Sequence, residues 1–393
     1  MTKSKATRAG GERFVALDSM RGLLALTVVL FHLPSQGWLW TLRYIQHGHL
    51  AVTFFFVLSG FVIGTTYGER LANGFPVGRF LGLRIGRIYP LHLFMIAVLL
   101  AWQLCRLAFD IGAVRDGVPF MGKFDPALLP YHIFLLQKFG WTLGWNDPSW
   151  SIGVEWWVYV SFALIVAFIT VRRNAALAAI LMLLPEVAQR LTHSSLGTGV
   201  DATIDCLFCF GLGLLVCQLR RTRLWPGTGR IASTTATLLE LAAVALSLWM
   251  IAHFGGKLSP LIGPTFALTI AIFSIERGWV SRLLVTAPML LIGELSYSIY
   301  MIHHFILDRM IDLVWAFGER LHLPISITST GRTVLVGNPL ACDLFSLLLL
   351  AVVIACSVLS FRYVEKPARL WSRRVLNPNH SEKVTPRDPP AAF

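Results

Sequence analysis

Long runs of apolar residues, each bounded by polar or charged positions, follow one another along this chain from near its start to near its end. Runs of about 17 to 25 residues are long enough for a helix to cross the hydrocarbon core of a membrane. The pattern predicts about ten of them. They are residues 14–33, 48–67, 88–104, 152–171, 174–189, 203–219, 232–253, 259–276, 285–305 and 341–361. We therefore expect an all-α membrane protein, a bundle of about ten transmembrane helices.

The basic residues between these runs predict an orientation. If the N-terminus is cytoplasmic, roughly two thirds of the 34 Lys and Arg residues lie in cytoplasmic segments, as expected from the positive-inside rule. Both termini are then cytoplasmic. The first run has no small-residue cleavage site after it, so we expect a retained span and not a signal peptide.

Composition supports this class. The 393 residues are 55% hydrophobic and 14% charged, against about 25% charged in soluble domains. The positive-inside bias explains the net charge of +13, so no nucleic-acid partner is expected. Cys206 and Cys209 have no second pair or histidine cluster near them in sequence, so we interpret them as packing residues and expect no metal. Residues 1–374 form the predicted transmembrane domain and 375–393 a disordered cytoplasmic tail.

Two ionisable residues stand inside the first apolar run. Arg21 and His32 are eleven residues apart, which is about three helical turns, so they share a stripe of the helix and lie roughly 16 Å apart along it. An ionisable group in lipid costs on the order of 3 kcal/mol or more and is a functional candidate by default. Asp18, three residues before Arg21, offers it a buried ion pair on the same face.

Two further segments carry charge next to apolar runs. Arg84 and Arg87 are one turn apart, so both can hold the same anion, and arginine binds phosphate through paired hydrogen bonds. An ordinary basic flank of a span explains the same spacing. Glu155 lies in the first turns of a span beside Trp150, after a predicted helix cap at Ser149 or Ser151. A carboxylate in that place needs a partner or a function.

A polar stripe follows late in the chain. Tyr297 and Tyr300 are a turn apart, and His303 shares the face of Tyr300. Either a polar lining of the bundle or a wall that binds an acceptor explains this stripe. Ser59 can bond a backbone carbonyl, and we do not expect it to be a nucleophile, because no base is adjacent in sequence. Glu365 is interpreted as a local charge partner at a helix end.

Six segments together resemble motifs of the membrane-bound acyltransferase-3 family, in the family's order. They are LDSMRGLLALTVVLFH, FFFVLSGF, RIGRIYP, WSIGVEWW, SYSIYMIHH and FRYVEKPAR, which together span residues 17–369. Each is weak alone, and the ordered set is specific. One departure is that Asp201 and Asp205 stand where members often carry an arginine before a phenylalanine-glycine motif.

The resemblance implies transfer of an acyl group, most often acetyl, from acetyl-coenzyme A to a hydroxyl of a carbohydrate at the bacterial inner membrane. Members modify lipopolysaccharide O-antigen, exopolysaccharide, rhizobial signalling oligosaccharides and some macrolides. We expect exopolysaccharide or a lipid-linked oligosaccharide as acceptor, and proteins of polysaccharide synthesis or export as partners. The implied catalytic residues are His32, Arg21 and Glu155, the implied donor contacts are Arg84, Arg87 and Tyr89, and the implied acceptor contacts are Asp18, Trp150, Ser151, Tyr297, Tyr300 and His303.

The expected mechanism uses His32 as general base on the acceptor hydroxyl, because its ordinary pKa near 6.5 suits proton transfer at neutral pH. Arg21 steadies negative charge on the donor or oxyanion, and Glu155 orients His32 or binds a sugar hydroxyl. The acceptor enters between the outer segments 105–151 and 306–340. A covalent acetyl-His32 intermediate stays open. The alternative function is a proton-coupled carbohydrate transporter or flippase, although neither repeats nor paired broken helices are seen.

Overall fold

We analysed the chain in a computed structural model. It describes residues 13–111, 117–139, 144–169, 175–192, 197–223, 225, 231–254, 261–321, 326–329 and 332–376. The expected disordered tail begins inside the last helix, α16 Lys366–Leu376, and its remaining residues, 377–393, lie outside the described residues.

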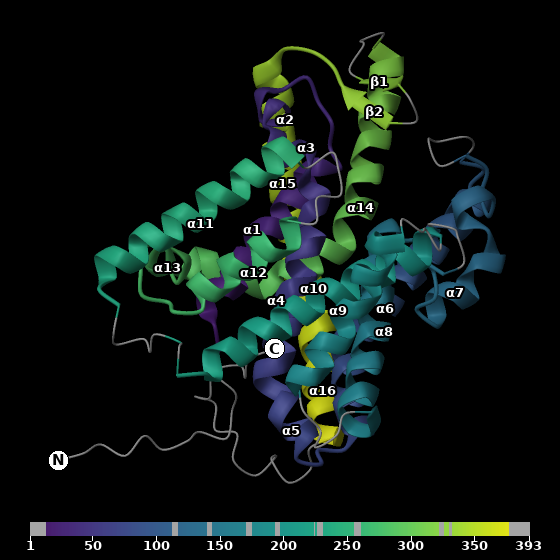
Figure 1. The fold of residues 1–393 in the computed structure, drawn as a ribbon. Coiled ribbons are helices and arrows are strands. Elements are labelled where there is room, and N and C mark those ends of the chain that lie inside the picture. Colours follow the sequence, from purple (N-terminus) through teal and green to yellow (C-terminus); the bar gives the residue numbers. More distant parts are fainter. Residues whose placement is uncertain are drawn as a thin grey trace.

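Each of the ten predicted apolar runs contains a helix (Figure 1). These are α1 Val15–Phe31, α4 Ala51–Ile63, α6 Val77–Ala108, α8 Trp150–Leu164, α9 Ala175–Thr192, α10 Thr198–Arg221, α11 Ser233–Phe254, α12 Ile262–Phe273, α14 Ala287–Leu321 and α15 Pro339–Ser360. Within the described residues, seven helical segments are long and apolar enough to cross a membrane. The all-α membrane class is confirmed. The count of ten spans is not, because α1, α9 and α12 are not among the seven.

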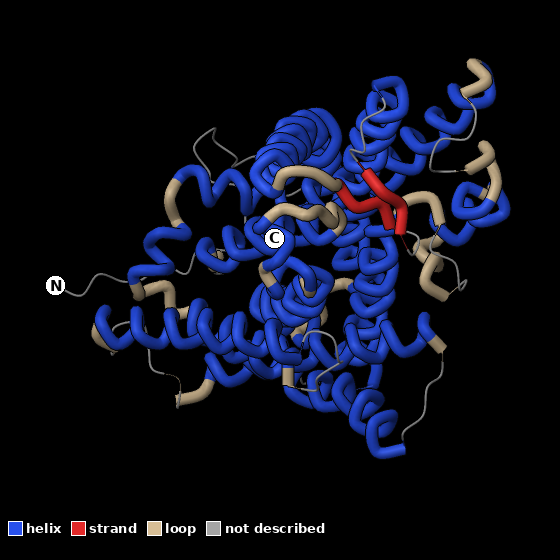
Figure 2. The backbone as a smooth tube through the Cα atoms, turned by 90° about the horizontal axis from the view of Figure 1, so that it is seen from above, coloured by secondary structure: helices blue, strands red, loops and turns tan. Residues whose placement is uncertain are grey.

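Short elements connect the long helices. They are α2 Trp38–Thr41, α3 Arg43–Gln46, α5 Glu69–Ala72, α7 Leu129–Ile133, α13 Trp279–Leu284 and the antiparallel strands β1 Ser326–Ser329 and β2 Arg332–Leu335. Figure 2 shows this hairpin as a small patch among helices. The outer segment expected at 306–340 is helical over its first half, because α14 continues to Leu321. An ion pair of 2.9 Å between Arg309 and Asp312, one turn apart, stabilises the extension.

Helices α1 and α14 run parallel and pack with their backbones in close approach. A Cβ added at Gly22 would lie 2.6 Å from the carbonyl carbon of Ile292. One added at Gly293 would lie 2.8 Å from the carbonyl oxygen of Asp18. Small residues permit such approach between membrane helices, where apolar burial alone does not distinguish protein from lipid. This contact sets the register that brings the polar stripes of the two helices together.

A second close pair, α4 and α10, holds the opposite side of the bundle. A Cβ at Gly60 would overlap the backbone of Phe210, and one at Gly213 would overlap that of Val57. The buried rings of Phe54, Phe61 and Phe210 belong to the main apolar core around this pair. The core therefore fixes α4, which forms one wall of the site described below.

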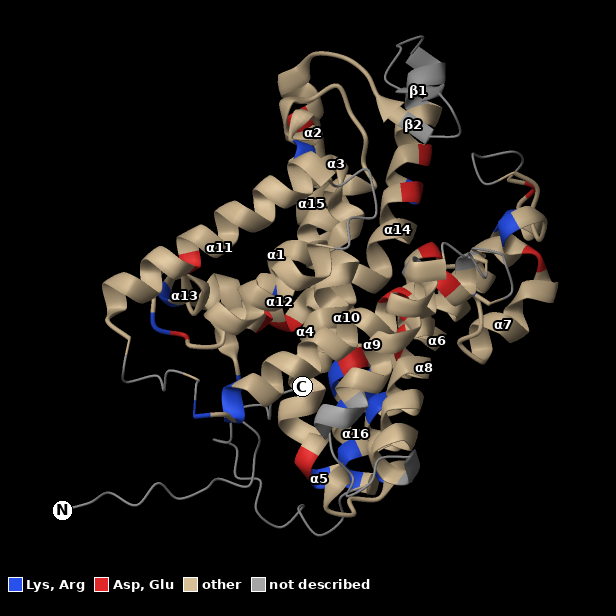
Figure 3. Ribbon diagram, viewed as in Figure 1, with Lys and Arg blue, Asp and Glu red and all other residues tan. Residues whose placement is uncertain are grey.

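Many basic side chains gather at one end of the bundle, around α5 and α16 (Figure 3). There α16 packs against the first turns of α6, with Ser372 next to Gly86 and Leu376 next to Gly82. This is the end that the positive-inside rule places in the cytoplasm. The orientation itself stays a prediction.

Candidate active site

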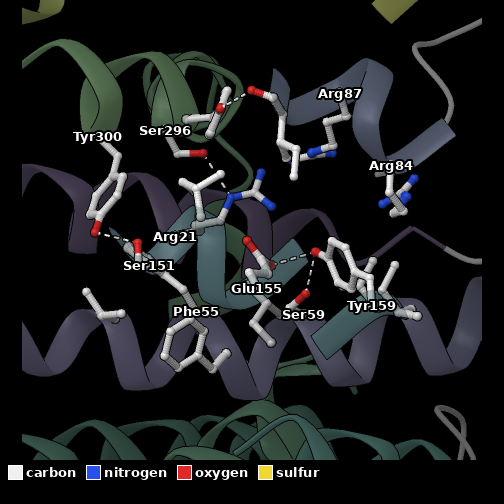
Figure 4. Close-up of a pocket in the computed structure, with 18 residues that line it drawn as sticks. Arg21, Phe55, Ser59, Arg84, Arg87, Ser151, Glu155, Tyr159, Ser296 and Tyr300 are labelled. Carbon is white, nitrogen blue, oxygen red and sulfur yellow. Dashed lines mark hydrogen bonds between the residues drawn. The ribbon is translucent and has the colours of Figure 1, made fainter. Parts of the chain in front are cut away.

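A cavity of about 90 Å³, here named the central cavity, lies between α1, α4, α6, α8 and α14 (Figure 4). Seven of the twelve predicted site residues line it, together with three polar residues that were not predicted. Its polar lining residues are Arg21, Ser59, Arg84, Arg87, Ser151, Glu155, Tyr159, Ser296, Tyr297 and Tyr300. Segments far apart in sequence thus meet at one site, as the ordered motifs suggested.

Arg21 is held at the cavity wall by two contacts. Its Nε donates a hydrogen bond of 2.8 Å to Ser296 Oγ on α14. One of its terminal nitrogens lies 3.6 Å from a carboxylate oxygen of Asp18. The other oxygen of Asp18 pairs with Arg13 Nε at 3.1 Å. Asp18 is buried and does not line the cavity, so the structure gives it the ion-pair position on α1 that its spacing predicts.

Glu155 belongs to a chain of hydrogen bonds across the cavity (Figure 4). The hydroxyl of Tyr159 donates to a Glu155 oxygen at 2.5 Å. Ser59 Oγ lies 2.7 Å from the same hydroxyl. Because the tyrosine proton is used toward Glu155, Ser59 is the donor in the second contact. These hydrogen bonds hold one carboxylate oxygen of Glu155 in place and connect α8 to Ser59 on α4.

The opposite end of the cavity is closed by Ser151 and Tyr300, whose hydroxyl oxygens are 2.7 Å apart. Ser151 Oγ donates to the carbonyl of Pro148 at 3.2 Å, so the tyrosine donates to the serine. The hydroxyl of Tyr297 donates to the carbonyl of Ile88 on α6. These bonds couple α8 and α6 to α14 and give the cavity a hydroxyl-rich end.

His32 ends α1 and lies beside His303, one turn beyond Tyr300, and neither histidine lines the central cavity. His303 Nδ1 is 2.7 Å from the carbonyl of Tyr300, and His32 Nδ1 is 2.9 Å from that of Val28. A carbonyl only accepts, so both Nδ1 atoms carry the proton in the neutral rings. His303 Nε2, 3.3 Å from His32 Nδ1, then accepts, and the basic lone pair of His32 is on Nε2.

A charged cluster surrounds the middle of α14, next to His32. The ring of His304 has Nε2 3.6 Å from Asp147 and Nδ1 3.3 Å from Asp308. Lys123 reaches the same Asp308 carboxylate at 3.5 Å. The His304 ring centroid is 5.4 Å from that of His32. This polar cluster next to His32 suits a hydrophilic, hydroxyl-bearing molecule more than a lipid tail.

The inner end of the central cavity is basic. Arg84 and Arg87, one turn apart on α6 as predicted, both line it, and both also line a second cavity toward α16. The charged side chains in the lining of the central cavity are three arginines, with Arg21 as the third, and one glutamate, Glu155. The balance favours an anionic group at this end.

Two predicted contact residues point elsewhere. Tyr89 donates its hydroxyl proton to the carbonyl of Ile133 at 2.8 Å. Trp150 packs beside Phe56, and Lys138 Nζ lies 4.8 Å above its ring. Burial lowers the pKa of Lys138. Neither Tyr89 nor Trp150 lines the central cavity, so their predicted contacts with donor and acceptor stay predictions.

Three lining residues were missed by sequence reasoning, yet two carry a local signal. Tyr159 is four residues after Glu155, and Ser296 is four residues before Tyr300, so each shares a helix face with a residue that was predicted. For Ser59 the sequence suggests a backbone carbonyl as partner, whereas the structure places its hydroxyl 2.7 Å from that of Tyr159 on another helix. Contacts between distant helices give no such signal in sequence.

Asp201 and Asp205, which stand where family members often carry an arginine, lie away from this site. Asp201 accepts a hydrogen bond of 2.7 Å from Gln189, and neither it nor Asp205 lines the central cavity. Cys206 and Cys209 are buried in the apolar core. Over the part of the chain that the structure describes, no three His, Cys, Asp or Glu residues are arranged to hold a metal ion.

The outer segment that was expected to cover the site packs on α6 and α8, and its described residues before Ser151 do not line the central cavity. His92 Nε2 lies 2.8 Å from the carbonyl of His132. Gln137 donates to the carbonyl of Ser149 at 2.7 Å. Burial, with the neighbouring His92, lowers the pKa of His132 to about 3, so this histidine is neutral at physiological pH.

Comparison with known proteins now adds to the geometry. A family model described as an acyltransferase domain matches residues 14–371. The chain is 27% identical to the acyltransferase MdmB of Streptomyces mycarofaciens over 337 residues, which is 79% of this chain and 81% of MdmB. It is 33% identical to protein 2 of the picA locus of Rhizobium radiobacter over 149 residues, 36% of this chain and 76% of that protein.

A more distant relative is the O-acetyltransferase OatA of Staphylococcus aureus, 23% identical over 328 residues. The match covers 73% of this chain but 49% of OatA, so the chain spans about half the length of that relative. No solved structure matches the chain.

Proposed function

The chain belongs to the membrane-bound acyltransferase-3 family and is a membrane acyltransferase, and from this premise we propose its donor and its acceptor. The donor is an acyl-coenzyme A, with acetyl as the acyl group, at the cytoplasmic face of the bacterial inner membrane. The acceptor is a hydroxyl of a cell-surface or exported carbohydrate. The O-acetyltransferase activity in the name of OatA supports the acetyl group and the oxygen acceptor.

One observation carries the proposal: Arg84 and Arg87 line both the central cavity and the second cavity beside α16. The two cavities therefore meet at a pair of arginines. The central cavity extends from these arginines to Ser151 and Tyr300. His303 lies one turn beyond Tyr300 on α14, beside His32. The arginine end suits the phosphates of a donor, and the hydroxyl-lined end suits the hydroxyl of an acceptor.

These residues fit an acyl-coenzyme A. Arginine forks match phosphate oxygens, and Arg84 and Arg87 would hold them. When bound, the donor supplies a thioester carbonyl with a good leaving group. Arg21, which faces the central cavity and is fixed by Ser296, would stabilise negative charge on the donor within the bundle.

His32 would act as general base on the acceptor. Its Nε2 takes the hydroxyl proton as the acceptor oxygen bonds to the acyl carbon and the carbon–sulfur bond breaks. The imidazolium returns that proton to the departing thiolate, so atoms and charge balance. Eleven residues of α1 separate His32 from Arg21, about 16 Å in a continuous helix. We therefore assign Arg21 to stabilising the donor and His32 to deprotonating the acceptor.

Labelled acetyl transfer tests the proposal. Membranes that contain the protein, radiolabelled acetyl-coenzyme A and a native surface glycan are expected to give labelled glycan. His32→Ala should abolish transfer at equal expression, whereas His253→Ala, on the exposed side of α11, should not. Undiminished transfer by His32→Ala would remove this base from the mechanism. Label that stays on the wild-type protein without glycan would instead indicate an acetyl-enzyme.

A further inference from the structure

The second cavity, here named the arginine cavity, lies where α16 packs on α6. Four of its seven lining residues are arginines, two from each helix: Arg84 and Arg87 on α6, and Arg369 and Arg373 on α16. Ser372 also lines it. Among the described residues, no acidic side chain lines it. Four cations held around one small space repel each other unless an anion is present.

The position of α16 is built into the fold. A Cβ at Gly86 would overlap the side chain of Ser372, so this side chain packs directly on the backbone of α6. The π-helical turn η8 Phe361–Glu365 precedes α16 and buries Glu365. Ser298 on α14 donates to one Glu365 oxygen at 2.8 Å, and Arg369 pairs with the other at 3.3 Å. These bonds fix the C-terminal helix against the bundle.

The carboxylate of Glu365 pairs with Arg369 and does not line the arginine cavity. Arg84 is only 6% exposed, and among the described residues its Nε has no hydrogen-bond acceptor. Its guanidinium lies 5.2 Å from the ring centroid of Tyr67, which also lines the cavity. Burying a guanidinium donor without an acceptor is unfavourable, and an anionic ligand would supply the acceptor.

We propose that α16 supplies half of a phosphate-binding site, in which Arg369, Ser372 and Arg373 act together with Arg84 and Arg87. The ligand group is a phosphate of the acyl-coenzyme A donor, its diphosphate bridge or its 3′-phosphate. This inference rests on the proposed function and extends it, because the C-terminal helix becomes part of the donor site. An anionic phospholipid headgroup offers the same phosphate chemistry and is the competing source.

Equilibrium binding of radiolabelled coenzyme A to the full chain in phosphatidylcholine nanodiscs tests the site without turnover. Arg373→Gln is expected to weaken coenzyme A binding at least about tenfold, the effect of one lost hydrogen bond between charged groups. The matched control, Arg374→Gln, removes the same charge one residue further on, at an exposed position that lines neither cavity. It should bind as the wild type does.

Two further measurements separate a phosphate contact from a displaced helix. Arg373→Gln should transfer acetyl from acetyl-pantetheine, which lacks the nucleotide phosphates, at the wild-type rate. Gly86→Ala, which pushes α16 away without a change of charge, should weaken coenzyme A binding as well. An equal loss with acetyl-pantetheine and acetyl-coenzyme A would overturn the phosphate assignment.

The outcomes also separate this inference from the proposed function. If the wild type binds coenzyme A and Arg373→Gln binds it equally well, the α16 site is wrong and the donor stands. If the wild type does not bind coenzyme A, the proposed donor itself fails. If Arg373→Gln loses only its retention of phosphatidylglycerol from mixed nanodiscs, the site binds a headgroup and the inference is overturned.

Discussion

Because α1 and α14 approach closely, we predict that one added methyl group, in Gly22→Ala, separates the residues of the site on α1 from those on α14. At Gly22 an added Cβ would lie 2.6 Å from the carbonyl carbon and oxygen of Ile292 and 2.7 Å from the nitrogen of Gly293. Ordinary carbon contacts are about 3.5–4.0 Å. Gly22→Ala therefore requires the helices to separate by about 1 Å, because the atoms in the way are backbone.

That separation acts on two contacts that bridge the same pair of helices. Arg21 Nε bonds Ser296 on α14 at 2.8 Å, and His32 lies 3.3 Å from His303. A 1 Å displacement lengthens both beyond hydrogen-bond distance. A misplacement of about that size costs on the order of 100-fold in rate, and the overpacked interface costs about 1–3 kcal/mol of stability.

Labelled acetyl transfer by purified protein measures the effect, with thermal unfolding beside it. We expect kcat of Gly22→Ala to fall roughly 100-fold. The control is Gly78→Ala in the first turn of α6, where an added Cβ meets nothing within 4 Å. It should keep full activity and unfold at the same or a slightly higher temperature. Full activity of Gly22→Ala with unchanged unfolding would refute the claim that this interface holds the site.

Three further outcomes follow from the hydrogen bonds. Tyr159→Phe removes the proton donated to Glu155 and should lower kcat about tenfold or more; a rate within about twofold of wild type would contradict this role. His303→Gln should lower kcat, leave the KM for acetyl-coenzyme A unchanged and shift the pH–rate profile, because the Nδ1 proton of His32 loses the ring nitrogen of His303 as an acceptor; an unshifted profile would exclude this role of His303. Because burial lowers the pKa of His132 from 6.5 to about 3, below pH 6.5 the unfolded chain binds a proton that the folded chain does not. Stability should fall by roughly 1 kcal/mol per pH unit toward pH 3, and His132→Gln should flatten that slope; equal slopes would count against it.

Spacing along single helices predicted much of the site, since helix geometry is local. Arg84 and Arg87 do share a lining surface, and Glu155 does face the cavity. The register of α1 with α14 was not predictable from spacing in either helix. It depends on Gly22 meeting the backbone of Ile292, a contact between segments far apart in the chain. The pairing of His32 with His303 follows from that contact.

The arginine cavity shows more clearly why the remainder needed the structure. In sequence, the arginines of α16 look like the ordinary basic flank of a last span, and Glu365 looks like a local charge partner at a helix end. The local pairing is present, between Glu365 and Arg369, but the helical path continues into α16. Glu365 is also 1% exposed and bonded to Ser298 of another helix. Removing a carboxylate from water is costly, and fixed hydrogen-bond and ion-pair partners are needed to offset the desolvation energy. The bonds that hold Glu365 therefore also orient α16. In that orientation Arg373 lines the same cavity as Arg84 on α6. The residue spacing within either helix could not predict this arrangement.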